Sequence, residues 1–337
     1  MSALGRPAEA TAELGPGSRL GPYQLVYAVA QGGMARVWAA LDTTSGSVVA
    51  VKTIRPELAH DAGYRRLFED EARYASSVEH PNVCRVFGLA EEGGVLYIAM
   101  EWVVGESLAR IIKPAKSAPA EPVEPRMGAR LMADFCVALH AAHELRDEKG
   151  SAVRLVHADV SLQNLMVTRQ GGVKLVDFGV ARARTTGSRN VPKMDGKAAY
   201  MAPEHAAGKR LSRLSDVFTL GICLYEVTTG KRPFATGNWD ATIERLLAGE
   251  FVPPSELSED YPPELERVLL RAMAQSPAHR FPSALRMKRA LEDWLRKSGP
   301  PIGPGEVAAF LEQRAGPGIA QREDYIAQTL GRAPAKR

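Results

Sequence analysis

The residues best suited to chemistry lie in two short motifs near the middle of the chain. The first, at residues 157–164, reads HADVSLQN, and the second, at residues 177–179, reads DFG. Asp159 and Asn164 lie five residues apart, and Asp177 follows thirteen residues later beside a glycine. Two carboxylates and an amide in this order supply one general base and two oxygen ligands for a hard cation such as Mg²⁺. The pattern predicts a phosphate-transfer centre.

A lysine and a glutamate form a second candidate pair. In an expected strand at residues 47–54, Lys52 alternates with apolar residues on one face. In an expected helix at residues 65–79, Glu71 falls on the apolar stripe. Two opposite charges on inward faces predict an ion pair. The alternative is that the lysine stem lies along the surface with its ammonium in water and that Glu71 is solvated.

These motifs resemble those of the protein kinases, and the resemblance runs over residues 20–297. It also rests on VAVK at residues 49–52, DEAR at residues 70–73 and APE at residues 202–204. The chain resembles the bacterial eukaryotic-like (Hanks-type) serine/threonine protein kinases. That resemblance implies an α+β, bilobal protein kinase fold, with a small antiparallel sheet and one helix in the first lobe and a mainly helical second lobe.

The resemblance implies transfer of the γ-phosphoryl group of MgATP to Ser/Thr hydroxyls of protein substrates, as part of signal transduction. Lys52, paired with Glu71, would hold the α- and β-phosphates, Asp159 would orient the substrate hydroxyl, and Asn164 and Asp177 would hold Mg²⁺. The nucleotide contacts that the resemblance implies are Ala30, Gln31, Gly32, Gly33, Val37, Ala50, Lys52, Met100, Glu101, Val103, Asn164, Met166 and Asp177. The glycine-rich turn is degenerate, because Ala30 and Ala35 occupy the places of the first and third glycines.

Two departures from the family pattern affect the catalytic loop. Ala158 replaces the Arg that in many kinases pairs with a phosphorylated activation loop, so control by phosphorylation of the nearby loop (Thr185, Thr186 and Ser188) is not expected. Ser161 stands where serine/threonine kinases usually carry a Lys, and Lys197 replaces a Thr of the substrate-side turn. We hypothesise that Lys197 supplies the missing cation as a catalytic residue. The alternative is an exposed lysine in a basic loop.

Three further residues are expected to be structural. The resemblance implies that Glu204 pairs with Arg280 and that Asp216 braces the catalytic loop from the helix that follows it.

Two other functions remain open alternatives. A pseudokinase that binds nucleotide or partners without efficient turnover is suggested by Ala30, Ala158 and Ser161, although Lys52 and Asp159 are retained. A small-molecule phosphotransferase of the aminoglycoside or choline type shares the H-x-D-x-x-x-x-N loop. The APE segment argues against that second class.

The composition fits a globular enzyme of two lobes. The 337 residues are 45% apolar and 24% charged, with a net charge of +4. No segment predicts a membrane span or a leader, so we expect a cytoplasmic protein. No basic run predicts nucleic-acid binding. The three cysteines are expected to be buried thiols, and His140 and His143 are expected to lie in a packed helix rather than to bind a metal. The oligomeric state is not indicated.

The elements that must position the motifs can be read from hydrophobic periods and turns. Strands are expected at residues 23–30, 37–41, 47–54, 83–90 and 95–102. After the helix at 65–79, helices are expected at residues 127–147, 215–229, 239–248, 263–274 and 283–297. The predicted domains are a disordered N-terminus (1–18), a kinase domain (19–298, with lobes at 19–104 and 105–298 and a Pro-rich insertion at 113–126) and a C-terminal tail with short helices (299–337).

Overall fold

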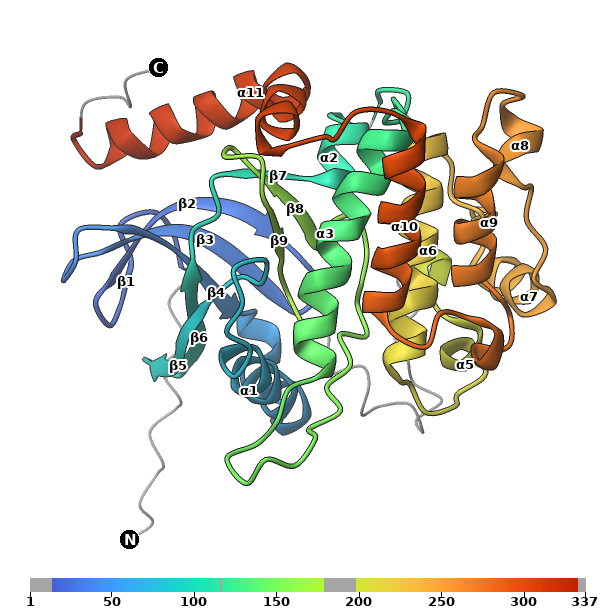
Figure 1. Ribbon diagram of the computed structural model, residues 1–337. Coiled ribbons are helices and arrows are strands. Elements are labelled where there is room, and N and C mark those ends of the chain that lie inside the picture. The colour runs from blue at the N-terminus through green and yellow to red at the C-terminus, as the bar shows by residue number, and fades with distance from the viewer. Residues whose placement is uncertain (1–13, 116, 179–197, 333–337) are drawn as a thin grey trace, which may run out of the picture. The chain divides into compact units, whose positions relative to one another are not determined.

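The computed structural model describes residues 14–115, 117–178 and 198–332 (Figure 1). The chain forms two compact units, each held together by its own contacts. Unit 1 contains the residues up to Arg73, Val86–Trp102 and the residues from Arg322 onward. Unit 2 contains Tyr74–Arg85 and Val103–Gln321. The division therefore does not follow a single cut near residue 104, because the end of the chain belongs with unit 1.

Unit 1 is built on a six-stranded antiparallel sheet with the order β1-β2-β3-β4-β6-β5. The strands are β1 (Arg19–Leu20), β2 (Tyr23–Gln31), β3 (Ala35–Asp42), β4 (Val48–Ile54), β5 (Val86–Glu92) and β6 (Val95–Glu101). A short 3-10 turn, η1 (Pro56–Leu58), and the helix α1 (Ala62–Ser76) follow β4. The predicted strands and the single helix are present, with ends shifted by a few residues.

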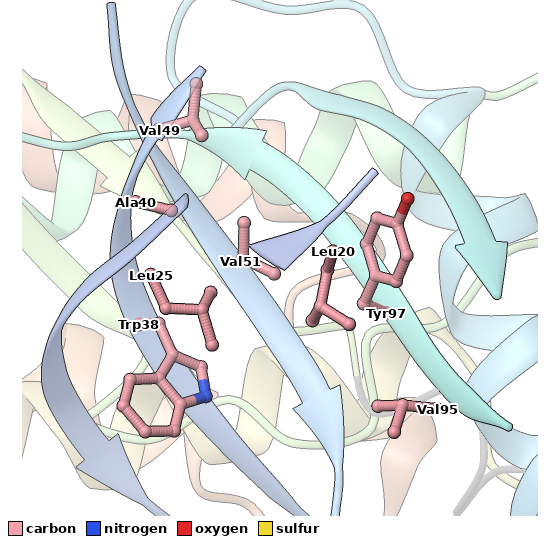
Figure 2. Close-up of a cluster of buried hydrophobic side chains, with 8 residues drawn as sticks. All are labelled: Leu20, Leu25, Trp38, Ala40, Val49, Val51, Val95 and Tyr97. Atoms are coloured by element: carbon pink, nitrogen blue, oxygen red, sulfur yellow. The ribbon is translucent and has the colours of Figure 1, made fainter. Parts of the chain in front are cut away.

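The register of β3 and β4 divides the sheet into two faces. Val37 lies opposite Lys52, and Ala39 lies opposite Ala50. Residues directly opposite in an antiparallel pair share a face, and their neighbours point to the other side. The second face is a packed core (Figure 2), made of Leu20, Leu25, Trp38, Ala40, Val49, Val51, Val95 and Tyr97. The first face therefore carries the residues that sequence analysis assigned to the nucleotide.

Residues 14–18, which were expected to be disordered, are ordered against this sheet. The N–H of Gly17 donates to the carbonyl of Leu25, and the N–H of Leu25 donates to the carbonyl of Ser18. Leu14 packs against the core cluster. The apolar contact of one leucine and two backbone hydrogen bonds outweigh the disorder that the composition of this segment predicts. The rest of the predicted disordered segment lies outside the described residues.

Unit 2 is mainly helical, with one three-stranded sheet in the order β7-β8-β9. Its strands are β7 (Gly105–Ser107), β8 (Leu165–Thr168) and β9 (Val173–Leu175). Its longer helices are α3 (Pro125–His143), α6 (Arg213–Thr229), α7 (Trp239–Ala248), α9 (Pro263–Ala272) and α10 (Ala284–Ser298), with shorter turns at α2 (Leu108–Ile112), η2 (Ala198–Tyr200), α5 (Pro203–Ala206), α8 (Pro254–Leu257) and η3 (Pro277–His279). The three short strands were not predicted.

The helix α6 forms the centre of unit 2, and nearly all of its residues are buried. A capping box between Ser212 and Ser215 starts the helix, and Gly230 ends it in the left-handed conformation. Its apolar run is long because protein surrounds it on all sides. Among the described residues, no helix has both the length and the apolar character required to cross a membrane. All three cysteines are free and buried, as predicted.

The C-terminal region differs from the predicted short helices. One helix, α11, runs over Pro304–Thr329 and contains Pro317. Its first part packs in unit 2, where Arg314 pairs with Glu121 at 2.7 Å, and just before the helix Arg130 donates to the carbonyl of Ile302 at 2.9 Å. From Arg322 onward the chain belongs to unit 1. The Pro-rich insertion precedes α3, which begins at Pro125.

Candidate active site

In unit 1, Lys52 and Glu71 form the ion pair predicted from the sequence. Lys52 Nζ lies 2.5 Å from Glu71 Oε1, and each side chain is 12% exposed. Lys52 extends from β4 and Glu71 from α1, so the pair ties the sheet to its helix. A charge pair this well enclosed is attractive only with direct contact, because both groups lose most of their water. The pair fixes the ammonium at one place on the sheet face.

The apolar part of this face lies beside Lys52. Ala50 lies opposite Met100 of β6, and Lys52 lies opposite Ile98, so all four side chains share one face. Val37 joins them from β3. Ala50 and Met100 are buried, whereas Val37 is half-buried. A flat apolar surface ends at a single ammonium, an arrangement that suits a planar base attached to phosphates.

The turn between β2 and β3 holds the degenerate glycine motif. The N–H of Gly32 donates to the carbonyl of Ala35 at 2.8 Å, and Arg36 donates to the side chain of Gln31 at 2.9 Å. Ala30, Gln31, Gly32 and Gly33 are all exposed at this turn. Ala30 forms part of the ladder opposite Val37, where an Ala fits as well as a Gly. The loss of the first glycine therefore leaves the hairpin intact.

In unit 2, the catalytic loop brings Asp159 and Asn164 together. Asn164 Nδ2 donates to the backbone carbonyl of Asp159 at 2.8 Å and lies 3.4 Å from Asp159 Oδ2. The N–H of Val176 donates to the carbonyl of Asn164 at 3.0 Å. The residue next to Asp177 is therefore hydrogen-bonded to Asn164. One side-chain hydrogen bond and one backbone hydrogen bond therefore connect Asp159, Asn164 and the residue before Asp177.

His157 holds this loop from within the core. Its ring is fully buried, Nδ1 accepts the N–H of Asp159 at 3.3 Å, and Nε2 donates to the carbonyl of Val176 at 3.2 Å. These partners assign the neutral tautomer with its proton on Nε2. Burial lowers the pKa of His157 below its ordinary value, although the carboxylates of Asp216 and Asp159 act in the opposite direction. A neutral imidazole thus positions the backbone of Asp159.

Asp216 braces the loop, as predicted, and His143 braces Asp216. The buried carboxylate accepts the N–H of His157 at 2.8 Å and the N–H of Ala158 at 2.9 Å. His143 Nε2 lies 2.8 Å from Asp216 Oδ2. Burial by itself raises the pKa of Asp216, but the hydrogen bond and charge of His143 and the N–H of Ala158 bring it below the ordinary value. The sequence placed His143 in a packed helix without finding this contact.

Asp177 and Phe178 continue the site from the end of β9. Asp177 has φ of 54°, in the left-handed region, which costs a non-glycine residue about 1 kcal/mol or more. Phe178 is buried, and its ring centroid lies 4.8 Å from that of His157. The buried Phe178 and the histidine ring fix the backbone that presents the Asp177 carboxylate.

Met166 and Val103 are the other proposed nucleotide contacts in unit 2. Met166 lies on β8 between Ser107 of β7 and Lys174 of β9 and is half-buried. Val103 is buried just before β7. Glu101 belongs to unit 1, where it lies opposite Val49 at the end of β6.

The predicted pair of Glu204 and Arg280 is present and buried. Arg280 Nη1 lies 2.7 Å from Glu204 Oε1, and Nη2 lies 2.8 Å from Oε2. Arg280 also donates to the carbonyls of Ala274, Leu214 and Gln275. Burial by itself raises the pKa of Glu204, but hydrogen bonds from Arg280 and Ser215 bring it below the ordinary value. This pair joins the APE segment to the surroundings of α6.

A polar cluster that the sequence did not predict is formed by Tyr200, Glu226 and Arg232. The Tyr200 hydroxyl donates to Glu226, and Arg232 Nε donates to Glu226 Oε1 at 2.9 Å. The guanidinium carbon of Arg232 lies 5.2 Å from the centre of the Tyr200 ring. Burial raises the pKa of Tyr200, and the Glu226 carboxylate raises it further. The sequence signal was Glu226 inside the apolar run at residues 217–227, because a buried carboxylate needs a partner.

The donor set fits Mg²⁺ better than a transition metal. Among the described residues, no group of three or more His, Cys, Asp or Glu side chains could hold a metal ion on its own. Magnesium takes hard oxygen ligands and usually needs only one or two protein groups, with water and phosphate oxygens completing the set. Since Asn164 uses Nδ2 toward Asp159, its Oδ1 remains the acceptor of that amide. Asn164 and Asp177 match this requirement.

Lys197, Thr185, Thr186 and Ser188 lie outside the described residues. The hypothesis that Lys197 replaces the cation lost at Ser161 therefore stays a prediction. Ser161 itself is buried, and its carbonyl accepts the N–H of Asn164 at 2.9 Å.

Comparisons with known proteins agree with the fold and the motifs. The family model for the protein kinase domain matches residues 23–291. Among curated relatives, the tyrosine-protein kinase MasK of Myxococcus xanthus is 39% identical over 302 residues, covering 88% of this chain and 46% of that protein. The serine/threonine-protein kinase PknB of Mycolicibacterium smegmatis is 34% identical over 276 residues, covering 80% of this chain and 42% of its own length.

A solved structure is also similar. The crystal structure of the Mycobacterium tuberculosis PknI kinase domain superposes with a TM-score of 0.63 at 25% identity, covering 83% of this chain and 99% of that domain. The chain spans less than half the length of the curated relatives named above. With the family model matching most of the chain and the motifs in place, the chain belongs to the protein kinase family and is similar to bacterial Hanks-type serine/threonine kinases.

Proposed function

We propose that this protein transfers the γ-phosphoryl group of MgATP to Ser/Thr hydroxyls of protein substrates. The observation that carries most weight is the enclosed ion pair of Lys52 and Glu71. A purely structural role does not require a lysine on this face, because an apolar residue would pack there without the cost of removing a charge from water. Membership in the kinase family supplies a use for the ammonium, namely the α- and β-phosphates of ATP.

The proposed mechanism assigns one task to each group. Ala50, Val37 and Met100 provide the apolar surface for adenine, and Lys52 holds phosphate oxygens. Asp159 orients the substrate hydroxyl and accepts its proton as the phosphoryl group moves. The link from Asn164 Nδ2 to the Asp159 carbonyl keeps that loop in one conformation.

Mg²⁺ would be held by Asn164 and Asp177, and when bound it neutralises charge on the phosphates. The left-handed backbone of Asp177 and the burial of Phe178 fix the direction of the carboxylate. The residues of the chain thus supply orientation, one proton acceptor and one phosphate-binding cation.

Serine or threonine is the proposed acceptor, and tyrosine is the second candidate. PknB of Mycolicibacterium smegmatis and PrkC of Bacillus subtilis are named serine/threonine kinases, whereas MasK is named a tyrosine kinase. Phosphoamino-acid analysis of the product separates the two. The retained Lys52, Asp159, Asn164 and Asp177 favour either kinase over a pseudokinase.

The substrates, the cellular role and the location of this protein are predictions. Protein substrates and a role in signal transduction follow from the family. A cytoplasmic location and the absence of nucleic-acid binding are expected from the sequence alone.

Lys197 is proposed to supply the cation lost at Ser161. Lys197→Ala should then slow turnover steeply at saturating ATP, and Lys197→Thr with Ser161→Lys should recover much of it.

The test of the proposed function is incubation of the protein with γ-labelled ATP, Mg²⁺ and a generic basic protein. We expect label on the protein substrate, mainly on Ser and Thr. Asp159→Asn is the matched negative control, because it replaces one carboxylate oxygen by an NH2 group and keeps the side-chain shape. Nucleotide binding without label transfer, in wild type and control alike, would favour the pseudokinase.

A further inference from the structure

The last part of α11 packs on the sheet of unit 1. Ile326 is 4% exposed and forms one buried cluster with Val26 of β2 and Ala39 of β3. The Tyr325 ring lies 5.3 Å from the Tyr27 ring. The guanidinium of Arg332 donates to the carbonyl of Gly46, in the turn that joins β3 to β4. An apolar contact, a ring contact and a polar contact therefore hold residues 322–332 to β2, to β3 and to the turn between β3 and β4.

This contact is on the nucleotide-facing side of the sheet. Leu41 and Val48 pack against the Ile326 cluster, and they lie opposite each other in the ladder of β3 and β4. Two residues further along the same face lie Ala39 and Ala50, which are also opposite each other. The opposite face carries the separate core cluster shown in Figure 2. Residues 322–332 and the proposed adenine contacts thus share one face.

Partly buried members of the cluster lie directly beside proposed nucleotide residues. Val29 precedes Ala30 on β2, and Trp102 lies between Glu101 and Val103. Val48 is two residues from Ala50 on β4. At the other end of the same face, Lys52 pairs with Glu71 of α1. The apolar surface proposed for adenine therefore lies between α1 and the end of α11.

We propose that residues 322–332 form one wall of the adenine site, with Ile326 as its central positioning residue. The inference rests on the proposed function, since it concerns the same nucleotide. The segment lies outside residues 23–291, which match the kinase family model. Ile326 covers Val26 and Ala39, and this cover fixes the β-strands that carry Ala30, Val37 and Ala50.

Two reciprocal consequences follow from thermodynamic linkage. If the segment holds the adenine surface in its binding form, releasing the segment weakens the binding of adenine nucleotides. By reciprocity, bound nucleotide must hold the segment more firmly. On the phosphate-binding side of the site, Lys52 pairs with Glu71 of α1 and lies two residues beyond Ala50 on β4, whereas Val48 of the Ile326 cluster lies two residues before Ala50. Binding of a phosphate chain without a base should therefore be insensitive to the segment.

The test uses the 337-residue chain with Mg²⁺ and compares the binding of ADP with that of inorganic tripolyphosphate by calorimetry. Ile326→Asp introduces a carboxylate into the buried cluster, and Ile326→Ala is the milder variant if the first does not fold. Gln328→Asp is the matched control, because it introduces the same charge at an exposed position two residues away. Hydrogen exchange of residues 322–332 reports whether the segment is attached.

We expect Ile326→Asp to speed hydrogen exchange of residues 322–332 and to weaken the binding of ADP about fivefold or more. Tripolyphosphate binding should not change, and Gln328→Asp should match wild type in every measurement. ADP should slow exchange of the segment in wild type. Unchanged ADP affinity in a variant whose segment is released, or equal losses for ADP and tripolyphosphate, would overturn this inference alone. Absence of ADP binding by wild type would overturn the proposed function and this inference together.

Discussion

The Asp216 carboxylate accepts the backbone N–H of Ala158 at 2.9 Å, and Ala158 has φ of 63°. An alanine in the left-handed region carries a strain of about 1–2 kcal/mol. Asp216 offsets that strain by accepting two neighbouring N–H groups, those of His157 and Ala158. A buried side chain from α6 thus determines the backbone conformation one residue before Asp159.

Ala158→Gly should therefore stabilise the protein rather than destabilise it. Glycine adopts this φ without strain, and the gain exceeds the entropy that it adds to the unfolded chain, so we expect about 0.5–1 kcal/mol in the free energy of unfolding. Urea denaturation measures the change. Ala309→Gly, at an exposed position inside α11, is the control and should cost about 1 kcal/mol. Equal losses at both positions would contradict the strain argument.

Lys52→Met should abolish phosphotransfer and leave the protein folded. The substitution keeps the length of the stem, so the packing of β4 is retained, while Glu71 loses its ion pair and the phosphate contact is lost. We expect a fall in turnover of at least about 100-fold at saturating ATP. Lys149→Met, at an exposed lysine, should leave turnover unchanged. Wild-type turnover by the Lys52→Met protein would remove this residue from the proposed mechanism.

Some contacts of the site could be predicted from the sequence, whereas others were found only in the structure. The pair of Lys52 and Glu71 was predicted from the inward faces of a strand and a helix, and the pair of Glu204 and Arg280 from the resemblance to the protein kinases. The contact of His143 with Asp216 depends on how α3 and α6 pack, and a histidine on an apolar helix does not reveal its partner.

The C-terminal helix shows the limit of local patterns more clearly. Gly316, Pro317 and Gly318 predict a break, because proline removes a hydrogen bond and glycine weakens a helix. The helix continues through them. Tertiary contacts on both sides, at Arg314 and at Ile326, outweigh the local preference. The strands β7 to β9 were missed for a related reason, since three or four residues are too few to show a period.

Asp177→Asn and Asp159→Asn should separate metal binding from chemistry. Asp177→Asn should lose the Mg²⁺ dependence of nucleotide binding, because an amide is a much weaker ligand for a hard cation than a carboxylate. Asp159→Asn should bind nucleotide with Mg²⁺ as wild type does and lose turnover, because the proton acceptor is gone. Calorimetry and single-turnover assays measure the two properties. The reverse result would exchange the assigned roles.

Stability should fall when the pH drops below about 6.5, partly through His157. Burial keeps the pKa of folded His157 below its ordinary value, whereas the unfolded histidine gains a proton near pH 6.5. The unfolded state then binds more protons, so the stability present above pH 6.5 is lost as the pH falls toward the folded pKa. The slope contributed by this group is at most about 1.4 kcal/mol per pH unit. Proton uptake on unfolding at pH 5.5 should be smaller in His157→Gln than in wild type, and an unchanged uptake would contradict the argument.

Arg280→Met should be among the most destabilising substitutions in unit 2. It leaves the buried Glu204 carboxylate without its bidentate partner and removes the donor to three backbone carbonyls. Breaking a buried pair from one side costs about 3–5 kcal/mol. Chemical denaturation measures the loss, and Glu204→Gln in the same chain should recover part of it, because the uncompensated charge is then gone.

Arg267→Met is the matched control for that prediction, because Arg267 pairs with Glu264 at 3.1 Å on the surface. Both side chains of this pair are more than half exposed, so water already screens the two charges. The loss there should stay below about 1 kcal/mol. A similar loss at both arginines would mean that Arg280 contributes through packing of its stem alone, and the double variant would then be no more stable than Arg280→Met.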